Sequence, residues 1–229
     1  MDHKGLTEKS NPCFFSAMRK LIKFCFYHFY HSFAWTYDSV AAAVSVGRWR
    51  DWGGAALPYV MGPVVLETGF GPGHLQVELN RMGYRTIGLD ESWPMIRQAS
   101  ANLRSHQMPP KLARGLAQQL PYANACFDCV LASFPTDYIV DKHCLEEIQR
   151  VLKPGGRVVV LPAAGMHRAA LPDRFASWLF QITGQHADVS AGLEMRYTTI
   201  FSQAGFKVRI TRAEIRQSTV MIVLAEKPI

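Results

Sequence analysis

Short apolar runs, rich in Val, Ile and Leu, recur along the chain and are separated by glycine turns and by stretches with helical spacing. Each run is typical of a strand that is buried on both faces, as in a parallel sheet. The pattern predicts strands over residues 64–66, 86–89, 112–115, 129–132 and 157–161, with helices over 74–82 and 141–152 between them. In the first helix, Leu75, Leu79 and Met82 are expected on one face. This alternation indicates an α/β fold.

The two ends of the chain follow other patterns. Residues 1–12 are polar, and 14–33 predict an amphipathic helix whose apolar face is rich in phenylalanine. At the carboxyl end, 197–204, 206–210 and 219–225 predict a helix and two strands. We therefore expect an N-terminal tail and helical cap over 1–58 and one larger domain over 59–229, in which 163–195 forms an insertion that joins the cap.

Three glycines, Gly69, Gly71 and Gly73, follow the first strand and precede the first helix. A turn of this kind lets a ligand lie against the backbone at a helix N-terminus. The spacing is G-x-G-x-G, however, whereas a dinucleotide fingerprint has G-x-G-x-x-G. Glu67 stands just before the turn, where its charge would repel a phosphate and favour a ligand that carries an ammonium group.

Asp90 ends the second strand, at about the distance from the turn where an acidic residue binds the ribose hydroxyls of a nucleotide. Ser92 can cap the helix that follows. Turn and carboxylate together predict an adenosine site.

With these residues in place, the chain resembles the class I S-adenosylmethionine-dependent methyltransferases, and within them the small-molecule group that includes quinone-biosynthesis enzymes. The resemblance spans five motifs in the expected order: VLETGFGPG, GLDESWPM, GLAQQLPY, FDCVLAS and RVLKPGGRVVVL. It implies a Rossmann-like, doubly wound, seven-stranded sheet that is mostly parallel with an antiparallel last strand. It also implies a helical cap before the sheet and S-adenosyl-L-methionine as the cofactor.

The resemblance also suggests the site residues. Family members usually place an acidic residue for the adenine amine where this chain has Leu116, so we expect the Ala117 backbone and the Gln118 side chain to take that contact. A base is needed only if the acceptor atom carries a proton. The expected cofactor-binding residues are Glu67, Gly69, Gly71, Gly73, Asp90, Glu91, Met95, Ala117, Gln118 and Ser133, and the candidates for a base are Tyr37, Asp137, Tyr138 and His143, each with a structural role as the favoured alternative.

The composition limits which kinds of partner we expect. The net charge of +7 favours an anionic partner, but the basic residues are scattered and do not form a nucleic-acid tract. Cys126 and Cys129 have CxxC spacing without further ligands, so no metal is expected. Nothing resembles a signal peptide or a membrane span, which favours a cytoplasmic protein. The helix over 14–33 is expected to be a lid over the cofactor, with peripheral membrane contact as the alternative.

The predicted activity is methyl transfer to a small acceptor that is apolar or aromatic, because both expected cap segments are rich in Phe, Trp and Ile. The methylated atom and the oligomeric state are not assigned. Two alternatives stay open: a non-catalytic nucleotide-binding accessory protein and an NAD-dependent oxidoreductase. The glycine spacing and Glu67 disfavour the second of them.

Overall fold

A computed structural model describes residues 49–166 and 191–229. Tyr37, the predicted helix over 14–33 and residues 175–182 of the predicted insertion therefore lie outside the described residues. Within the described ranges, no helix has the length and apolarity that crossing a membrane requires.

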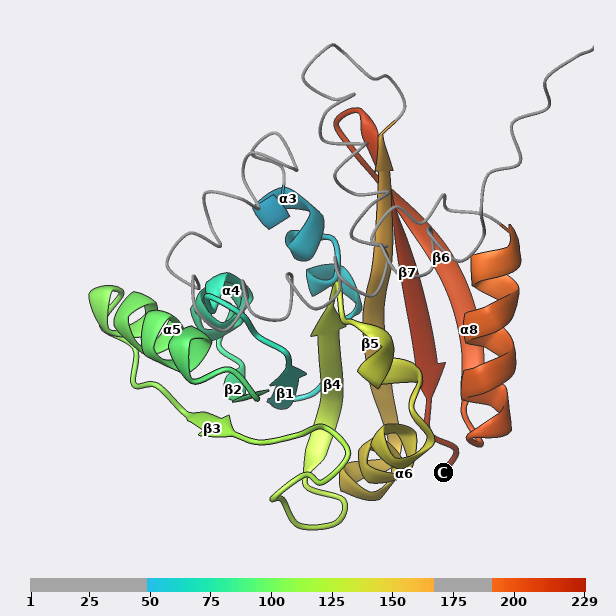
Figure 1. The fold of residues 1–229 in the computed structure, drawn as a ribbon, viewed down its shortest axis with the longest axis horizontal. Coiled ribbons are helices and arrows are strands. Elements are labelled where there is room, and N and C mark those ends of the chain that lie inside the picture. Colours follow the sequence, from blue (N-terminus) through green and yellow to red (C-terminus); the bar gives the residue numbers. More distant parts are fainter. Residues whose placement is uncertain (1–48, 167–190) are drawn as a thin grey trace, which may run out of the picture.

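A seven-stranded sheet forms the centre, with strand order β3-β2-β1-β4-β5-β7-β6 (Figure 1). Strands β1 to β5 are parallel, and β7 runs antiparallel to both of its neighbours. The fold class predicted from the sequence is confirmed. The strands are β1 (Val64–Thr68), β2 (Arg85–Asp90), β3 (Leu112–Arg114), β4 (Phe127–Ser133), β5 (Leu152–Met166), β6 (Lys207–Ile215) and β7 (Ser218–Glu226).

Helices cover both faces of the sheet. One core joins Val65 of β1 to α3 and α4, and the other joins its neighbour Leu66 to α6 and α8, as the alternation of side chains along a strand requires. Figure 1 shows α4 and α5 beside β2 and α8 beside β6. The helices are α3 (Trp49–Gly54), α4 (His74–Arg81), α5 (Trp93–Ser105), α6 (Lys142–Val151) and α8 (Ala191–Gln203), with short 3-10 turns η2 (Leu57–Tyr59) and η3 (Asp137–Val140).

The fifth strand is longer than predicted. The sequence suggested a proline and glycine stop over 153–156 and a strand over 157–161, but β5 starts at Leu152 and continues to Met166. The glycines lie where the pairing with β4 shifts in register, because Phe127 pairs with Leu152 but Cys129 pairs with Arg157. Gly155 takes a φ of 73° there. Beyond Leu161, the hydrogen bonds come from β7, whose Ser218 to Met221 pair with Ala163 to Met166. The antiparallel partner thus extends the strand where the parallel one has ended.

Three local predictions also need correction. Met82 is 53% exposed. The helix α4 ends at Arg81, so Met82 no longer has helical geometry and does not share the buried face of Leu75 and Leu79. Ser92 is the N-cap residue of α5, as predicted, but its side chain makes no capping bond. The predicted helix over 197–204 starts earlier, at Ala191.

Candidate cofactor and acceptor site

The glycine turn between β1 and α4 packs closely against Tyr138 and Ala99. Gly69 has a φ of 66°, and a Cβ there would lie 2.8 Å from the Tyr138 hydroxyl. Gly73 is the N-cap residue of α4 with a φ of 78°, and a Cβ would lie 2.8 Å from the Cβ of Ala99. Both positions combine a left-handed backbone with a steric limit, so only glycine fits them.

Glu67 is buried at the carboxyl end of β1, with 1% of its surface exposed. Its Oε2 accepts a 2.8 Å hydrogen bond from Nε2 of Gln76, whose side chain is also buried. Its Oε1 has no hydrogen-bond partner among the described residues. Burial raises the pKa of Glu67 to about 8 although the Gln76 hydrogen bond lowers it, and the nearby Asp90 carboxylate adds to the rise.

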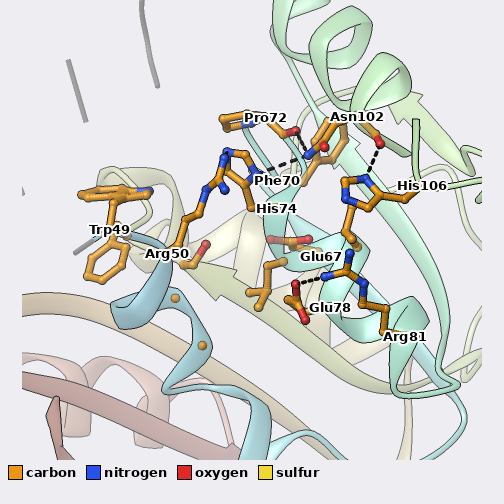
Figure 2. A pocket seen from close by; sticks show the side chains of 16 residues that line it. Trp49, Arg50, Glu67, Phe70, Pro72, His74, Glu78, Arg81, Asn102 and His106 are labelled. Atoms are coloured by element: carbon orange, nitrogen blue, oxygen red, sulfur yellow. Dashed lines mark hydrogen bonds and ion pairs between the residues drawn. The ribbon is translucent and has the colours of Figure 1, made fainter. Parts of the chain in front are cut away.

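A cavity of about 210 Å³ opens above Glu67, between the glycine turn and α3. Figure 2 shows its lining from close by. Trp49 of α3 and Phe134, which follows β4, form an aromatic wall, with ring centroids 4.5 Å apart and planes inclined at 42°. Ser133 lines the same wall. Phe134 has a φ of 49°, a strained conformation for a non-glycine residue that is typical of functional sites.

The rim of the cavity carries basic and amide groups. Arg50 of α3 points toward His74 of α4, with Nη2 and Nε2 3.3 Å apart (Figure 2). On its other side, Nδ1 of His74 lies 3.3 Å from Nδ2 of Asn102, which donates to the carbonyl oxygen of Pro72. The cavity therefore pairs one buried carboxyl with a basic rim, an arrangement that suits a ligand with both an ammonium and a carboxylate group.

Asp90 lies on the other side of the turn and does not line this cavity. Its Oδ2 accepts from the Gly71 N–H at 3.1 Å, and its Oδ1 accepts from the Ser92 N–H at 2.9 Å. The carboxylate thus connects the glycine turn to the start of α5.

The segments that follow β2 and β3 lie side by side next to Asp90. The Gly115 N–H donates to the Asp90 carbonyl oxygen at 3.1 Å, and Nε of Arg114 donates to the Glu91 carbonyl oxygen at 3.0 Å. Each segment leaves one large apolar side chain half exposed, Trp93 after β2 and Leu116 after β3. These two side chains border the edge where the sequence predicts the adenine.

The other residues predicted to bind the cofactor differ in their exposure to solvent. Ala117 is buried and Gln118 is partly buried, both directly after Leu116. Met95 is 1% exposed, so its side chain packs in the core. Glu91 is exposed.

None of the described candidates for a base lines the cavity. The Tyr138 hydroxyl donates to the Thr68 carbonyl oxygen at 3.0 Å beneath the turn, and burial raises its pKa far above the ordinary range. Asp137 is largely exposed and lies 3.6 Å from Arg196. His143 is also exposed and lies 3.3 Å from Glu146 on α6. Tyr37 lies outside the described residues.

The structure brings Trp49, Arg50, His74 and Phe134 to the cavity. Trp49 and Arg50 belong to the predicted cap, and Phe134 to the segment after the fourth strand where such enzymes bind the acceptor, but the sequence singled out none of the four as a contact. His74 directly follows the last glycine of the turn. No cluster of His, Cys, Asp or Glu within 49–166 and 191–229 could hold a metal ion. Cys129 is buried in β4, and the Cys126 thiol donates to the Ala123 carbonyl oxygen.

Comparisons with known proteins agree with this geometry. Residues 66–160 match the family model described as a methyltransferase domain. The chain is 37% identical over 128 residues to the demethylmenaquinone methyltransferase of Mycolicibacterium paratuberculosis, covering 54% of this chain and 53% of the relative. It is 32% identical over 158 residues to that of Thermobifida fusca, covering 67% and 66%. The chain thus spans between about half and two thirds of the length of these relatives.

A similar fold occurs in a putative S-adenosyl-L-methionine-dependent methyltransferase of Methanococcus maripaludis, with a TM-score of 0.62 and 16% identity over 86% of this chain and 92% of the other. The chain belongs to the class I S-adenosylmethionine-dependent methyltransferases. Within that class it is similar to the enzymes of quinone biosynthesis, and the family and its cofactor are as the sequence predicted.

Proposed function

We propose that the protein transfers a methyl group from S-adenosyl-L-methionine to a small acceptor that is apolar or aromatic. The observation that carries the cofactor assignment is the buried Oε1 of Glu67, a residue that lines the cavity, because this atom has no hydrogen-bond partner among the described residues. A buried carboxyl oxygen without a hydrogen bond is unfavourable, and a ligand ammonium group would satisfy it.

The remaining groups of the cofactor have matching positions in the site. Arg50 and His74 would hold the carboxylate of the methionine part, since they lie together on the rim above Glu67. Asp90 would accept the ribose hydroxyls on the other side of the turn. The Ala117 backbone and Gln118 would contact the adenine between the exposed side chains of Trp93 and Leu116.

When bound, S-adenosyl-L-methionine supplies an electrophilic methyl group on a sulfonium, so the protein needs no nucleophile of its own. The protein has to hold the acceptor in line with that methyl group and to exclude water, and such orientation is worth up to about 7 to 11 kcal/mol. Glu67, Ser133 and Phe134 line the end of the cavity where β1 and β4 lie next to each other. We assign no general base.

The aromatic wall supports a planar acceptor. Trp49 and Phe134 offer ring faces and edges on which another aromatic ring can pack, at a gain of about 0.5 to 1.5 kcal/mol beyond the buried area. Relatives of this chain are named demethylmenaquinone methyltransferase and ubiquinone/menaquinone biosynthesis C-methyltransferase. A molecule with a quinol-like ring is therefore the first class of substrate to test. The cytoplasmic location, the membrane contact and the domain boundaries stay predictions.

The deciding experiment combines calorimetry with an assay of methyl transfer. We expect S-adenosylhomocysteine to bind and NADH not to bind, and radiolabelled methyl to enter a quinol or phenol in a substrate panel. A protein that binds the nucleoside but methylates nothing in a panel of phenols, quinols, amines, lipids and RNA would be the non-catalytic alternative. Methyl incorporation into RNA, with salt-sensitive binding, would overturn the small-acceptor assignment.

A further inference from the structure

We propose that Glu67 holds a proton in the ligand-free protein and releases it to solvent when the cofactor's ammonium group binds, so that binding is coupled to proton release near neutral pH. The proposal deepens the proposed function and rests on it, because the ammonium group is the one on the methionine part. It makes Glu67 an acid in the empty site and an ion-pair partner in the loaded one.

The surroundings of the carboxyl group favour the neutral form when no ligand is bound. Glu67 is 1% exposed, so ionisation there gives up nearly all hydration of the charge. The compensation is small: one hydrogen bond, from the uncharged amide of Gln76, reaches Oε2. The second oxygen, Oε1, receives nothing from the described residues. One neutral donor does not replace the solvation of a carboxylate.

The charged neighbours do not change this balance. Arg50 points at His74, and Arg81 forms a 2.6 Å ion pair with Glu78, so both arginines have other contacts. No cation among the described residues forms an ion pair or hydrogen bond with Glu67. The titratable or charged groups around it are Arg50 on α3, His74, Glu78 and Arg81 on α4, Asp90 on β2, His106 directly after α5 and Tyr138 on η3.

An arriving ammonium group changes the balance, because a positive charge beside a carboxyl favours its ionised form. The neutral acid loses its proton to the buffer, and the carboxylate then faces an ammonium that keeps all of its own protons. No bond other than the O–H bond of Glu67 breaks. The Gln76 hydrogen bond persists through the change, since an amide N–H can donate to a carboxyl oxygen in either state.

The coupling has a signature that reverses with pH. The carboxyl of Glu67 has a pKa of about 8 in the empty site, the amino group of the free ligand stays protonated in neutral solution, and the bound pair holds one proton between them. Binding should therefore release about 0.9 proton at pH 7 and about half a proton at pH 8, where half of Glu67 is already ionised, and it should turn to uptake only where the free amino group has itself lost its proton.

Calorimetry of S-adenosylhomocysteine binding measures these numbers directly. Titrations at pH 7, 8 and 9, each in two buffers with different ionisation enthalpies, give the number of protons exchanged from the dependence of the observed heat on the buffer. We expect the number of protons released to fall from pH 7 to pH 8, and release to be lost or reversed at pH 9. Glu67→Gln should bind with less than about 0.2 proton released at pH 7, and Glu146→Gln, an exposed carboxylate on α6, should behave like the wild type.

A ligand without an ammonium group supplies a control that needs no variant. Methylthioadenosine presents the nucleoside alone, so its binding to the wild-type protein at pH 7 should release no proton. Binding of S-adenosylhomocysteine without proton release at pH 7, or equal release by Glu67→Gln, overturns this inference and leaves the cofactor assignment intact. No binding of S-adenosylhomocysteine at any pH overturns the proposed function itself.

Discussion

The Tyr138 hydroxyl donates a 3.0 Å hydrogen bond to the Thr68 carbonyl oxygen, and it would lie only 2.8 Å from a Cβ at Gly69. Tyr138 of η3, in the segment that follows β4, therefore supports the turn that follows β1. A tyrosine in this position holds the backbone of the turn in place. It does not line the cavity, and its hydroxyl is bonded to Thr68.

Tyr138→Phe tests that assignment. We expect the free energy of unfolding to fall by about 1 to 2 kcal/mol, because the Thr68 carbonyl loses a donor. The melting temperature should fall by roughly 2 to 8 °C. The rate of methyl transfer at saturating substrates should stay within about twofold of the wild type. A stable variant with a rate reduced by about 100-fold, as the loss of a general base gives, would restore Tyr138 as a catalytic candidate.

Asp90→Asn should weaken the binding of S-adenosylhomocysteine by about tenfold or more, because the hydrogen bonds from the ribose hydroxyls to a carboxylate are charge-assisted. Asparagine is a sharper test than alanine, because alanine would also remove both acceptors of the Gly71 and Ser92 N–H groups. Calorimetry gives the affinity, and circular dichroism shows whether the variant is folded. Unchanged affinity would show that Asp90 is not a ribose ligand.

Arg50→Ala should weaken the binding of S-adenosylhomocysteine by about five- to tenfold, the modest effect of a partly exposed charge pair. Methylthioadenosine lacks the carboxylate, so its affinity should not change. Arg85→Ala is the matched control, since this exposed arginine is the first residue of β2 and lies at the end of the strand away from Asp90. An equal loss for both ligands would mean that Arg50 positions the turn and does not bind the carboxylate.

Trp49→Leu should raise the KM for an aromatic acceptor by about tenfold, because the ring that packs against Phe134 is lost. The affinity for S-adenosylhomocysteine should change by less than about twofold. Trp93→Leu is the matched change near the predicted adenine edge and should show the opposite pattern, with weaker cofactor binding and an unchanged KM for the acceptor. Identical profiles for the two variants would contradict the division of the site into two halves.

The ligand-free protein should lose stability relative to Glu67→Gln as the pH rises. The pKa of Glu67 is raised from 4.5 to about 8 by folding, so its favourable contribution is full below about pH 4.5 and is lost as the pH approaches 8. Between these values, the difference in unfolding free energy should shift by about 1.4 kcal/mol per pH unit in favour of the variant. Denaturant titrations at pH 6, 7 and 8 measure it, and parallel curves would contradict a neutral Glu67.

The parts of the fold and site that the sequence predicted depend on local patterns. Strand β1, the three glycines and Asp90 follow one another closely, and their hydrogen bonds join neighbouring segments. The aromatic wall and the basic rim could not be predicted in this way. Trp49 meets Phe134, and Arg50 meets His74, only after the sheet has brought α3 to the carboxyl end of β4. The extension of β5 likewise depends on a distant partner, β7.

The extended pairing of β5 with β7 bears on how such an enzyme can acquire new substrates. β4 pairs with β5 as far as Leu161, while β7 continues to pair with it as far as Met166. The chain thus leaves the sheet beyond the edge at which Glu67 and Asp90 lie. The hydrogen bonds that Glu67 and Asp90 accept from Gln76, Gly71 and Ser92 come from residues far before Met166. Changes in the segment that follows Met166 can therefore leave these bonds in place, so that natural selection can vary the acceptor while this part of the site stays fixed.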